Sequence, residues 1–327
     1  MRLYMGKGVM PLPPFITQPE DLITTDAATR SGFIEMALEK GHRANPILAE
    51  ARALRARAIN LGSTLAVIED EQIREAVLYA AGLSGKALGH LLEEDKIAAL
   101  QNFKETHLDV AGNDFPDELT YRYLLTRGDA LGGTMRNLAG QLADKKFLSG
   151  TVASLTIKQR PIQWRHKETK AWAAMTNAEE VSEFGSGLSW STGGQPRTLI
   201  FNAKVGIVRK NVDSVILSCL PQALNLKGVQ KPQNNPAFYV CLGELKGGID
   251  PAGADEHWKT ARSSIQRINA KFAEQGYNPQ KYFVGAAIVA NMANEIVNHL
   301  LNGGLNYAAN LTKDDQMAIF FDWLTDQ

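Results

Sequence analysis

The chain has 327 residues, enough for one large domain or two fused domains with a substantial buried core. Hydrophobic residues make up 44% of it and charged residues 21%, which excludes a largely disordered chain. Lysine and arginine balance aspartate and glutamate at a formal net charge of zero, so the chain is not strongly basic as a whole.

The charges are unevenly distributed along the chain. Residues 151–210 carry nine lysines and arginines against four acidic residues, whereas the segment after residue 251 carries six against eight. Phosphate groups respond to the local field rather than to the total charge. A neutral chain can therefore still contain a basic cleft that binds nucleic acid.

The cysteines and the start of the chain bear on its compartment. Cys219 and Cys241 both lie in apolar runs, and we expect free core thiols in a reducing bacterial cytoplasm rather than a disulfide framework. Arg2 and Lys7 are followed by prolines within residues 11–14 and by no long apolar stretch, so no signal peptide is predicted. No run reaches the roughly 20 apolar residues of a membrane span, so no membrane partner is expected.

The first part of the chain predicts helices. Apolar residues recur at helical spacing in residues 47–67, 71–81, 84–92 and 96–105. Ser84 is a candidate N-cap of the third of these helices. The turn-like residues 112–116 then separate a mainly helical domain, residues 1–115, from a second domain, residues 116–327.

The second part predicts a sheet with helices. A helical pattern resumes at Glu118 and meets a glycine-rich block at residues 127–133. Runs rich in β-branched, aromatic and apolar residues predict strands at residues 198–201, 205–208, 215–220, 237–245 and 282–289. Helices are predicted at residues 255–274 and 293–301, and a terminal helix starting with a Thr312–Asp315 capping box. Strand, helix and strand in this spacing form a βαβ unit, so the fold class is α/β (α+β).

Three charged residues are candidates for a metal-dependent hydrolytic site. Glu244 and Lys246 lie two apart on a predicted strand, so both side chains emerge on one face while Leu245 points into the core. Asp213 opens a neighbouring predicted strand. Magnesium prefers oxygen ligands and takes one or two carboxylates, and a nearby lysine can stabilise charge on a phosphate. The pattern is thus compatible with magnesium-dependent phosphodiester hydrolysis but does not establish it.

The alternative is a surface Glu–Lys pair at a strand end. The same acidic-x-Lys pattern occurs at residues 94–96, 144–146 and 168–170, but in helical or polar stretches, where residues two apart diverge around a helix axis. Only Glu244 combines a strand, a preceding aspartate on another strand and a following βαβ unit. His257, near the start of the next helix, can activate the attacking water, or it is a solvated histidine at a helix start.

Two longer blocks resemble a known family. Residues 118–119, 123–133 and 136–137 form one block, and residues 243–259, from Gly243 to Lys259, form the other. Both are similar to the AvaI/BsoBI type II restriction endonucleases. The resemblance implies a PD-(D/E)xK nuclease core, a mixed sheet flanked by helices, with an added helical domain that embraces DNA. Val212 stands where the superfamily signature has proline before the aspartate.

The resemblance also implies the function and its partners. Family members cut double-stranded DNA at the degenerate palindrome CYCGRG with Mg²⁺ and leave 5′ overhangs ending in phosphate. They act as homodimers, and a cognate DNA methyltransferase is a functional rather than a binding partner.

Site residues carry over by position. Asp213, Glu244 and Lys246 match the catalytic set and His257 the histidine that acts on water. With the backbone carbonyl of Leu245, Asp213 and Glu244 would hold the metal. Asp250 matches a residue that reads a base, plausible for a carboxylate facing a cytosine amino group. Lys86 matches a lysine that reads a neighbouring base.

Several alternatives stay open. Arg136, after a Gly-Gly pair, is a candidate phosphate contact, whereas Arg127 and Asp129 are either DNA contacts or an internal ion pair. The tryptophans at 164, 172 and 190 are base-stacking groups or packing. Rival functions are a repair or junction-resolving nuclease on the same core, and a non-catalytic DNA-binding or scaffold protein that carries the motif by chance.

Overall fold

The computed structural model describes residues 11–327, apart from the side chains of Arg136 and Val229. Arg2 and Lys7 lie outside the described residues, so the absence of a signal peptide stays a prediction. By contacts the chain divides into a sheet unit, formed by the residues up to Phe33 with Ala139–Gln327, and a helical unit, Ile34–Leu138. Residue 115, the last residue before the predicted boundary, is the first residue of a helix that continues into both units. The division of roles between residues 1–115 and 116–327 stays a prediction.

The helical unit is built around its own core. Its helices are α1 (Asp26–Leu61), α2 (Thr64–Glu69), α3 (Arg74–Ala80), α4 (Gly85–Leu88), α5 (Glu93–Phe103), α6 (Asp109–Ala111) and α7 (Phe115–Ile157), of which α1 and α7 continue into the sheet unit. Buried Leu54, Phe103 and Leu119 pack together at the centre. The hydroxyl of Ser84 accepts a hydrogen bond from the backbone N–H of Ala87, which confirms this residue as an N-cap.

Helix α7 continues through the glycine-rich block that follows the helical pattern from Glu118. Its 43 residues run without interruption through Gly128 and Gly132. A glycine inside a helix costs about 1 kcal/mol relative to alanine. The buried residues on either side of the block, among them Tyr123 and Phe147, stabilise more than this, so the helix persists.

The sheet unit contains one sheet of eight strands within the described residues. The strands are β1 (Gln163–His166), β2 (Trp172–Ala174), β3 (Gly185–Thr192), β4 (Gln195–Val205), β5 (Lys210–Leu217), β6 (Tyr239–Lys246), β7 (Gln280–Gly285) and β8 (Tyr307–Asn310). Their order is β2-β1-β3-β4-β5-β6-β7-β8. Neighbours are antiparallel up to β6, and β6, β7 and β8 are parallel. The predicted mixed sheet is confirmed.

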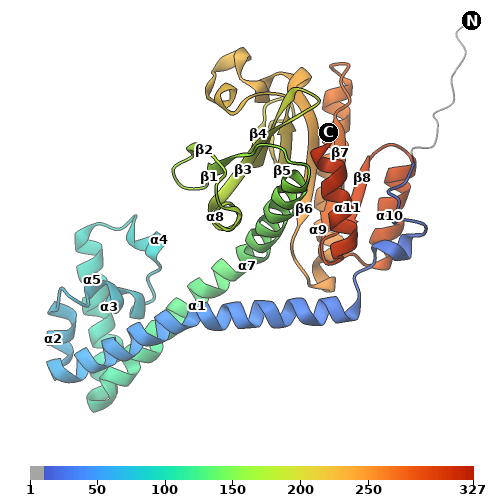
Figure 1. Cartoon of the computed structure of the whole chain (residues 1–327). Coiled ribbons are helices and arrows are strands. Elements are labelled where there is room, and N and C mark those ends of the chain that lie inside the picture. Colours follow the sequence, from blue (N-terminus) through green and yellow to red (C-terminus); the bar gives the residue numbers. More distant parts are fainter. Residues whose placement is uncertain (1–10) are drawn as a thin grey trace, which may run out of the picture. The chain divides into compact units, whose positions relative to one another are not determined.

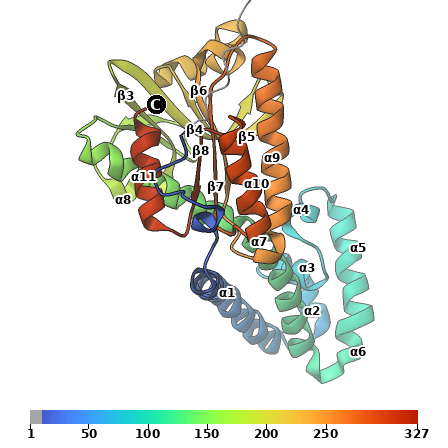
Figure 2. The same cartoon turned by 90° about the vertical axis from the view of Figure 1, so that its right-hand side faces the viewer.

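Helices cover both faces of the sheet (Figure 1). They are α8 (Ala178–Phe184), α9 (Pro251–Ala273), α10 (Ala290–Leu301) and α11 (Asp314–Thr325), besides the last part of α7. Residues of α7 and α11 form one core with the strands, and residues of α9 and α10 form cores on the opposite face (Figure 2). Because both faces are covered, β6 and β7 are buried along nearly their whole length.

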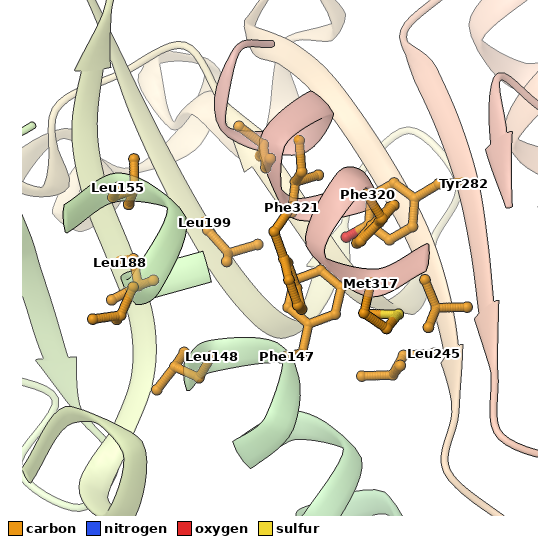
Figure 3. Close-up of a cluster of buried hydrophobic side chains, with 14 of the residues drawn as sticks. Phe147, Leu148, Leu155, Leu188, Leu199, Leu245, Tyr282, Met317, Phe320 and Phe321 are labelled. Carbon is orange, nitrogen blue, oxygen red and sulfur yellow. The ribbon is translucent and has the colours of Figure 1, made fainter. Parts of the chain in front are cut away.

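Aromatic side chains dominate the core beneath α7 and α11. The Phe147 ring lies 5.4 Å from the Phe321 ring, edge to face, and 6.0 Å from Tyr282, as the close-up shows (Figure 3). Leu245 reaches the same cluster from β6. This confirms that Leu245 points into the core, away from the face of its two neighbours in the strand.

Residues 22–24, just before α1, are hydrogen-bonded to the ends of the parallel strands. The Thr24 hydroxyl donates a hydrogen bond to the Ala286 carbonyl oxygen at 2.7 Å. The Asn310 amide donates to the Leu22 carbonyl oxygen at 2.8 Å. Leu22 itself is fully buried among residues of α9 and α10. The sheet unit therefore contains chain from both sides of the helical unit.

Two local expectations are wrong. Residues 206–209 form a turn after β4 rather than part of a strand, and Arg209 has a φ of 57°. The terminal helix begins at Asp314 without a capping box, because the Thr312 hydroxyl donates to the Asn310 side chain instead. The unit β6–α9–β7 is confirmed, with its strands parallel. Among residues 11–327, no helix combines the length and hydropathy needed to cross a membrane.

Candidate active site

Adjacent strands bring the two predicted carboxylates together. Strands β5 and β6 pair antiparallel with Ser214 opposite Gly243. Continuing this antiparallel register by one residue places Asp213 opposite Glu244. Like charges directly opposite each other in a sheet repel. A cation between them is required to relieve the repulsion.

Lys246 supplies such a cation. Its ammonium nitrogen lies 2.7 Å from Asp213 Oδ2 and 2.9 Å from Glu244 Oε2. The side chain of Glu244 is only 4% exposed, whereas those of Lys246 and Asp213 are 18% and 30% exposed. The three side chains thus form a half-open triad whose innermost member is Glu244. The predicted grouping of these residues at a strand end agrees with this geometry.

Burial dominates the charge state of Glu244. Desolvation, followed by the negative charge of Asp213, raises the pKa of Glu244 to about 7, although Lys246 and a hydrogen bond from Ser264 of α9 oppose the rise. For Lys246, burial alone would lower the pKa, but the charges of Glu244 and Asp213 outweigh it and raise the pKa. Lys246 is therefore a permanent cation in this arrangement, and Glu244 is poised between its two forms.

The backbone of β6 also contributes to the site. The Leu245 N–H donates a hydrogen bond to Asp213 Oδ2 at 2.9 Å. In an extended strand the N–H and the C=O of one residue point to the same side. The Leu245 carbonyl therefore points toward β5, beyond the last pair of the β5–β6 ladder, where it is available as a further oxygen ligand.

Two glycines after the triad allow close contacts. A Cβ atom on Gly247 would lie 2.1 Å from the Ala139 carbonyl oxygen, so α7 packs directly against this turn. A Cβ atom on Gly248 would lie 2.4 Å from Cε1 of His257. The imidazole of His257 therefore lies over Gly248, two residues beyond Lys246, on the side of the site where α9 begins.

Asp144 is a site residue that sequence reasoning missed. It lies on α7 next to Ala143, whose Cβ would be 2.7 Å from a Cβ on Gly247. Burial and then the charge of Asp213 raise the pKa of Asp144 to about 6, so the two carboxylates sense each other. Its acidic-x-Lys pattern was set aside as helical. No sequence signal separates Asp144 from an ordinary surface aspartate, because its proximity arises from tertiary packing.

Asp250 caps the helix that follows the site. Its side chain accepts a hydrogen bond from the Ala252 N–H at 2.9 Å, and the residue is exposed at the N-terminus of α9. Pro251 occupies the first helical position, where its missing N–H costs nothing. The carboxylate predicted to read a base is thus oriented by this hydrogen bond at the start of α9, the helix that also contains His257.

The other predicted DNA-binding residues belong to the helical unit. Lys86 lies exposed in α4. Arg136 lies in α7, and its side chain is outside the described part of the structure. Arg127 pairs with Glu50 at 3.3 Å and its guanidinium lies 5.1 Å from the Tyr79 ring centre, so the suggested pair with Asp129 is wrong.

The tryptophans are mainly core residues. Trp164 and Trp190 are buried in the core beneath α7 and α11. The Trp190 indole donates a hydrogen bond to the Thr325 carbonyl oxygen at 3.2 Å. For these two side chains the packing interpretation is confirmed, because neither presents a free face for a base.

Comparisons with known proteins identify the family of this chain. The family model described as "Restriction endonuclease BsobI" matches residues 14–327. The type II restriction enzyme AvaI of Nostoc sp. is 42% identical over 96% of this chain and 99% of the relative, and its namesake of Anabaena variabilis matches equally. The type II restriction enzyme BsoBI of Geobacillus stearothermophilus is 44% identical over 93% of this chain and 95% of the relative. A strand-end triad, a mixed sheet and likeness along almost the whole chain lead to one conclusion: the chain belongs to the BsobI family of restriction endonucleases.

Proposed function

We propose that this chain is a magnesium-dependent type II restriction endonuclease that cuts double-stranded DNA at the degenerate palindrome CYCGRG and leaves 5′-phosphate ends. The observation that supports the chemistry is the convergence of Asp213 and Glu244 on the Lys246 ammonium at the end of β6. The two carboxylates that surround the Lys246 ammonium also offer oxygen atoms to a metal cation. The family supports the DNA substrate and the recognition sequence.

The donor set fits magnesium. Asp213 and Glu244 would hold the ion together with the Leu245 carbonyl, which points toward β5 as argued above. The proposed site has only two carboxylates. Among residues 11–327, no group of three or more His, Cys, Asp or Glu side chains is arranged to hold a metal ion. Magnesium suits such a sparse site because it retains several waters and uses substrate phosphate as a ligand. When bound, it would act as a Lewis acid on the scissile phosphate.

The side chains of Lys246 and His257 would divide the remaining work. Because its pKa is raised, Lys246 keeps its proton and stabilises negative charge on the phosphate rather than accepting a proton. An imidazole nitrogen is a proton acceptor, so His257 would accept the proton of the attacking water. The ring of His257 lies over Gly248, two residues beyond Lys246 in the chain. The leaving group is the 3′ oxygen, so the phosphate stays on the 5′ end.

DNA recognition would use residues outside the triad. Asp250, fixed as the N-cap of α9, would accept a hydrogen bond from a cytosine amino group. Lys86 would read a neighbouring base and Arg136 would contact a phosphate. A homodimer would present two equivalent sites to the two halves of the palindrome.

The cellular setting follows from this function. A restriction enzyme needs a DNA methyltransferase of the same specificity to protect the host genome, as a functional partner. We place both enzymes in the bacterial cytoplasm. Cys219 and Cys241, both free and buried, are compatible with that reducing compartment.

Plasmid digestion with sequencing of the cut ends tests the proposal. The wild-type chain with Mg²⁺ should give discrete fragments with 5′-phosphate overhangs at CYCGRG, and none with EDTA. Glu244→Gln should lose cleavage by at least about 10³-fold while DNA binding persists, since the loss falls on the chemical step. Glu274→Gln, at an exposed residue paired with Lys271, is the matched control and should cut normally.

Other results would point to the rival functions. Cuts at junctions or lesions without a fixed sequence would indicate a repair or junction-resolving nuclease. No cleavage of any DNA, with or without divalent metal, would indicate a non-catalytic DNA-binding protein. Normal cleavage by Glu244→Gln would leave the enzyme class intact and remove the proposed metal site.

A further inference from the structure

Helix α7 presents an exposed ridge on the sheet unit, away from the triad. The ridge consists of Ser149, Ala153 and Ile157, which are spaced four residues apart and therefore align along one side of the helix. Ala153 is exposed, and Ile157 is 85% exposed. An isoleucine so exposed gains nothing from the fold of the single chain.

A mainly apolar groove runs along each side of this ridge. The groove between α7 and α11 has a volume of about 600 Å³, and its lining includes Gly150, Met317 and Phe321. The groove between α7 and α8 has a volume of about 660 Å³, and its lining includes Val152. Both grooves share the ridge residues as one wall. The face is therefore a ridge between two grooves.

The charges on the rim do not favour DNA as the occupant. Lysines of α7 lie beside exposed carboxylates of the flanking helices. Lys146 pairs with Asp314 at 2.7 Å, and Lys158 pairs with Asp322 at 2.9 Å. The side chains of these two aspartates are 88% and 68% exposed, and they would repel a phosphate backbone. A partner for this face must carry both signs of charge and an apolar centre.

We propose that the occupant is a second copy of this chain, docked α7 to α7 about a two-fold axis. A ridge formed by residues four apart fits into the corresponding groove of another helix at an angle of about −50°. A face that carries both one ridge and its grooves is self-complementary, as a two-fold interface requires. The lysines of α7 then meet carboxylates on α8 and α11 of the partner, and small Ser149 and Ala153 allow close approach.

The face is large enough to supply a major part of a dimer interface. The 12 residues from Lys146 to Ile157 span about 18 Å along α7. Three helices side by side are roughly 30 Å wide. The flat outline is therefore ~540 Å² before its corrugation is counted, of the order of the ~800 Å² that each partner buries in a standard interface. This surface gives a physical basis to the homodimer of the proposed function, on which it rests.

Analytical ultracentrifugation of the full-length chain tests the interface. The wild-type chain should sediment at twice its mass of 35.8 kDa. Ala153→Arg puts a long charged side chain on the ridge without touching the core, and Ile157→Glu removes the apolar knob. Each should weaken dimerisation by at least ~100-fold, as expected for a central interface residue. Ala270→Arg, an identical change at an exposed alanine on α9, should leave the dimer intact.

A cross-linking experiment adds a positive readout. Cys219 and Cys241 are both buried, so a cysteine introduced at position 153 would be the accessible thiol. A short bismaleimide should join two copies of Ala153→Cys and leave Ala270→Cys uncross-linked. Dimerisation of Ala153→Arg and Ile157→Glu at wild-type affinity would overturn the interface. So would a monomeric wild-type chain.

Plasmid cleavage measured in parallel separates this interface from the proposed function. A wild-type chain that cuts at a fixed sequence but dimerises through another surface, or not at all, refutes only the α7 interface. A chain that dimerises through α7 but cuts no DNA refutes the proposed function and leaves the interface standing.

Discussion

Burial makes the negative charge of Glu244 unfavourable to the folded state. Its pKa rises from 4.5 to about 7 through burial and the nearby Asp213. Between these two values the folded chain binds more protons than the unfolded chain, so the free energy of unfolding falls as pH rises. At 1.36 kcal/mol per pKa unit, the full penalty above pH 7 is about 3 kcal/mol at most. The negative charge of Glu244 above pH 7 therefore lowers the stability of the folded chain.

Replacing this carboxylate should stabilise the metal-free protein at alkaline pH. Glu244→Gln should raise the free energy of unfolding by about 1–3 kcal/mol at pH 8, where the glutamate is charged, and change it little at pH 5, where the glutamate is protonated. Urea denaturation in EDTA at both pH values measures the difference. Glu274→Gln, an exposed control, should stay within about 0.5 kcal/mol at both. An equal effect of Glu244→Gln at pH 5 and pH 8 would contradict the assignment.

Asp144 should tune the affinity of the site for its metal. Its carboxylate adds negative potential beside Asp213, so Asp144→Asn should raise the Mg²⁺ concentration for half-maximal cleavage about 3- to 10-fold. Burial and Asp213 raise the pKa of Asp144 to about 6, so the wild-type residue is neutral well below that pH. Titrations of Mg²⁺ at pH 5.5 and 8 should thus show the difference mainly at pH 8. Asp129→Asn, an exposed change on the same helix, is the control.

Some residues of this site could be predicted from the sequence and others could not. Glu244 and Lys246 were predictable because strand alternation is local, and it fixes which side chains share a face. The Leu245 side chain followed from the same rule. Asp144 and Ser264 were not predictable, because they reach the site from helices that pack on opposite faces of the sheet, and no local pattern records that packing.

At the scale of the element, α7 contains glycines with opposite surroundings. Nothing lies within 4 Å of a Cβ placed on Gly140, whereas a Cβ on Gly150 would lie 1.9 Å from the Phe321 ring. Gly140→Ala should therefore stabilise the chain by about 0.5–1 kcal/mol through helix propensity alone. Gly150→Ala should destabilise it by about 1–3 kcal/mol, because a rigid buried ring must move.

Chemical denaturation of the two variants compares them directly. Each replaces one glycine by alanine in the same helix, so helix propensity contributes equally and the difference reports the packing against α11. A destabilised Gly140→Ala would mean that the helix is not regular at that position. A neutral Gly150→Ala would mean that the contact between α7 and Phe321 is looser than the aromatic core indicates.

The same helix explains where element prediction failed. The glycine-rich block at residues 127–133 has the composition of a loop, yet it lies inside α7. Local propensity cannot weigh a few kcal/mol of glycine cost against the burial of residues a dozen positions away. The βαβ unit was predictable, because the long apolar runs of β6 and β7 and the periodic face of α9 are strong signals within the segment itself.

At the scale of the whole molecule, the chain leaves the sheet unit and returns to it. The helical unit is an insertion between Phe33 and Ala139, carried on the continuous helices α1 and α7. Hydrogen bonds of Thr24 and Asn310 fasten the chain before the insertion to the ends of β7 and β8. The composition of the chain does not reveal this arrangement. A turn leaves a signal in the sequence, whereas the packing of α7 against the sheet after the inserted helical unit leaves none.

The proposed homodimer would contain one triad per subunit, so the number of DNA strands cut by each subunit can be tested. If each subunit cuts one strand, a dimer of one wild-type chain and one Glu244→Gln chain should nick its site. Equal amounts of the two chains, mixed under conditions that exchange subunits, give about half mixed dimers in the 1:2:1 statistics of a two-fold assembly. Supercoiled plasmid with one site should then yield nicked circles with the mixture and linear DNA with the wild-type chain.

The control separates subunit exchange from simple dilution. Ala153→Arg with Glu244→Gln in the same chain should not form mixed dimers, so adding it to the wild-type chain should leave linear product unchanged. Slower formation of linear DNA without nicked circles would mean that one subunit cuts both strands in turn. Nicked circles with the Ala153→Arg double variant would mean that the subunits meet through a surface other than the α7 ridge, since the arginine would then not prevent their pairing.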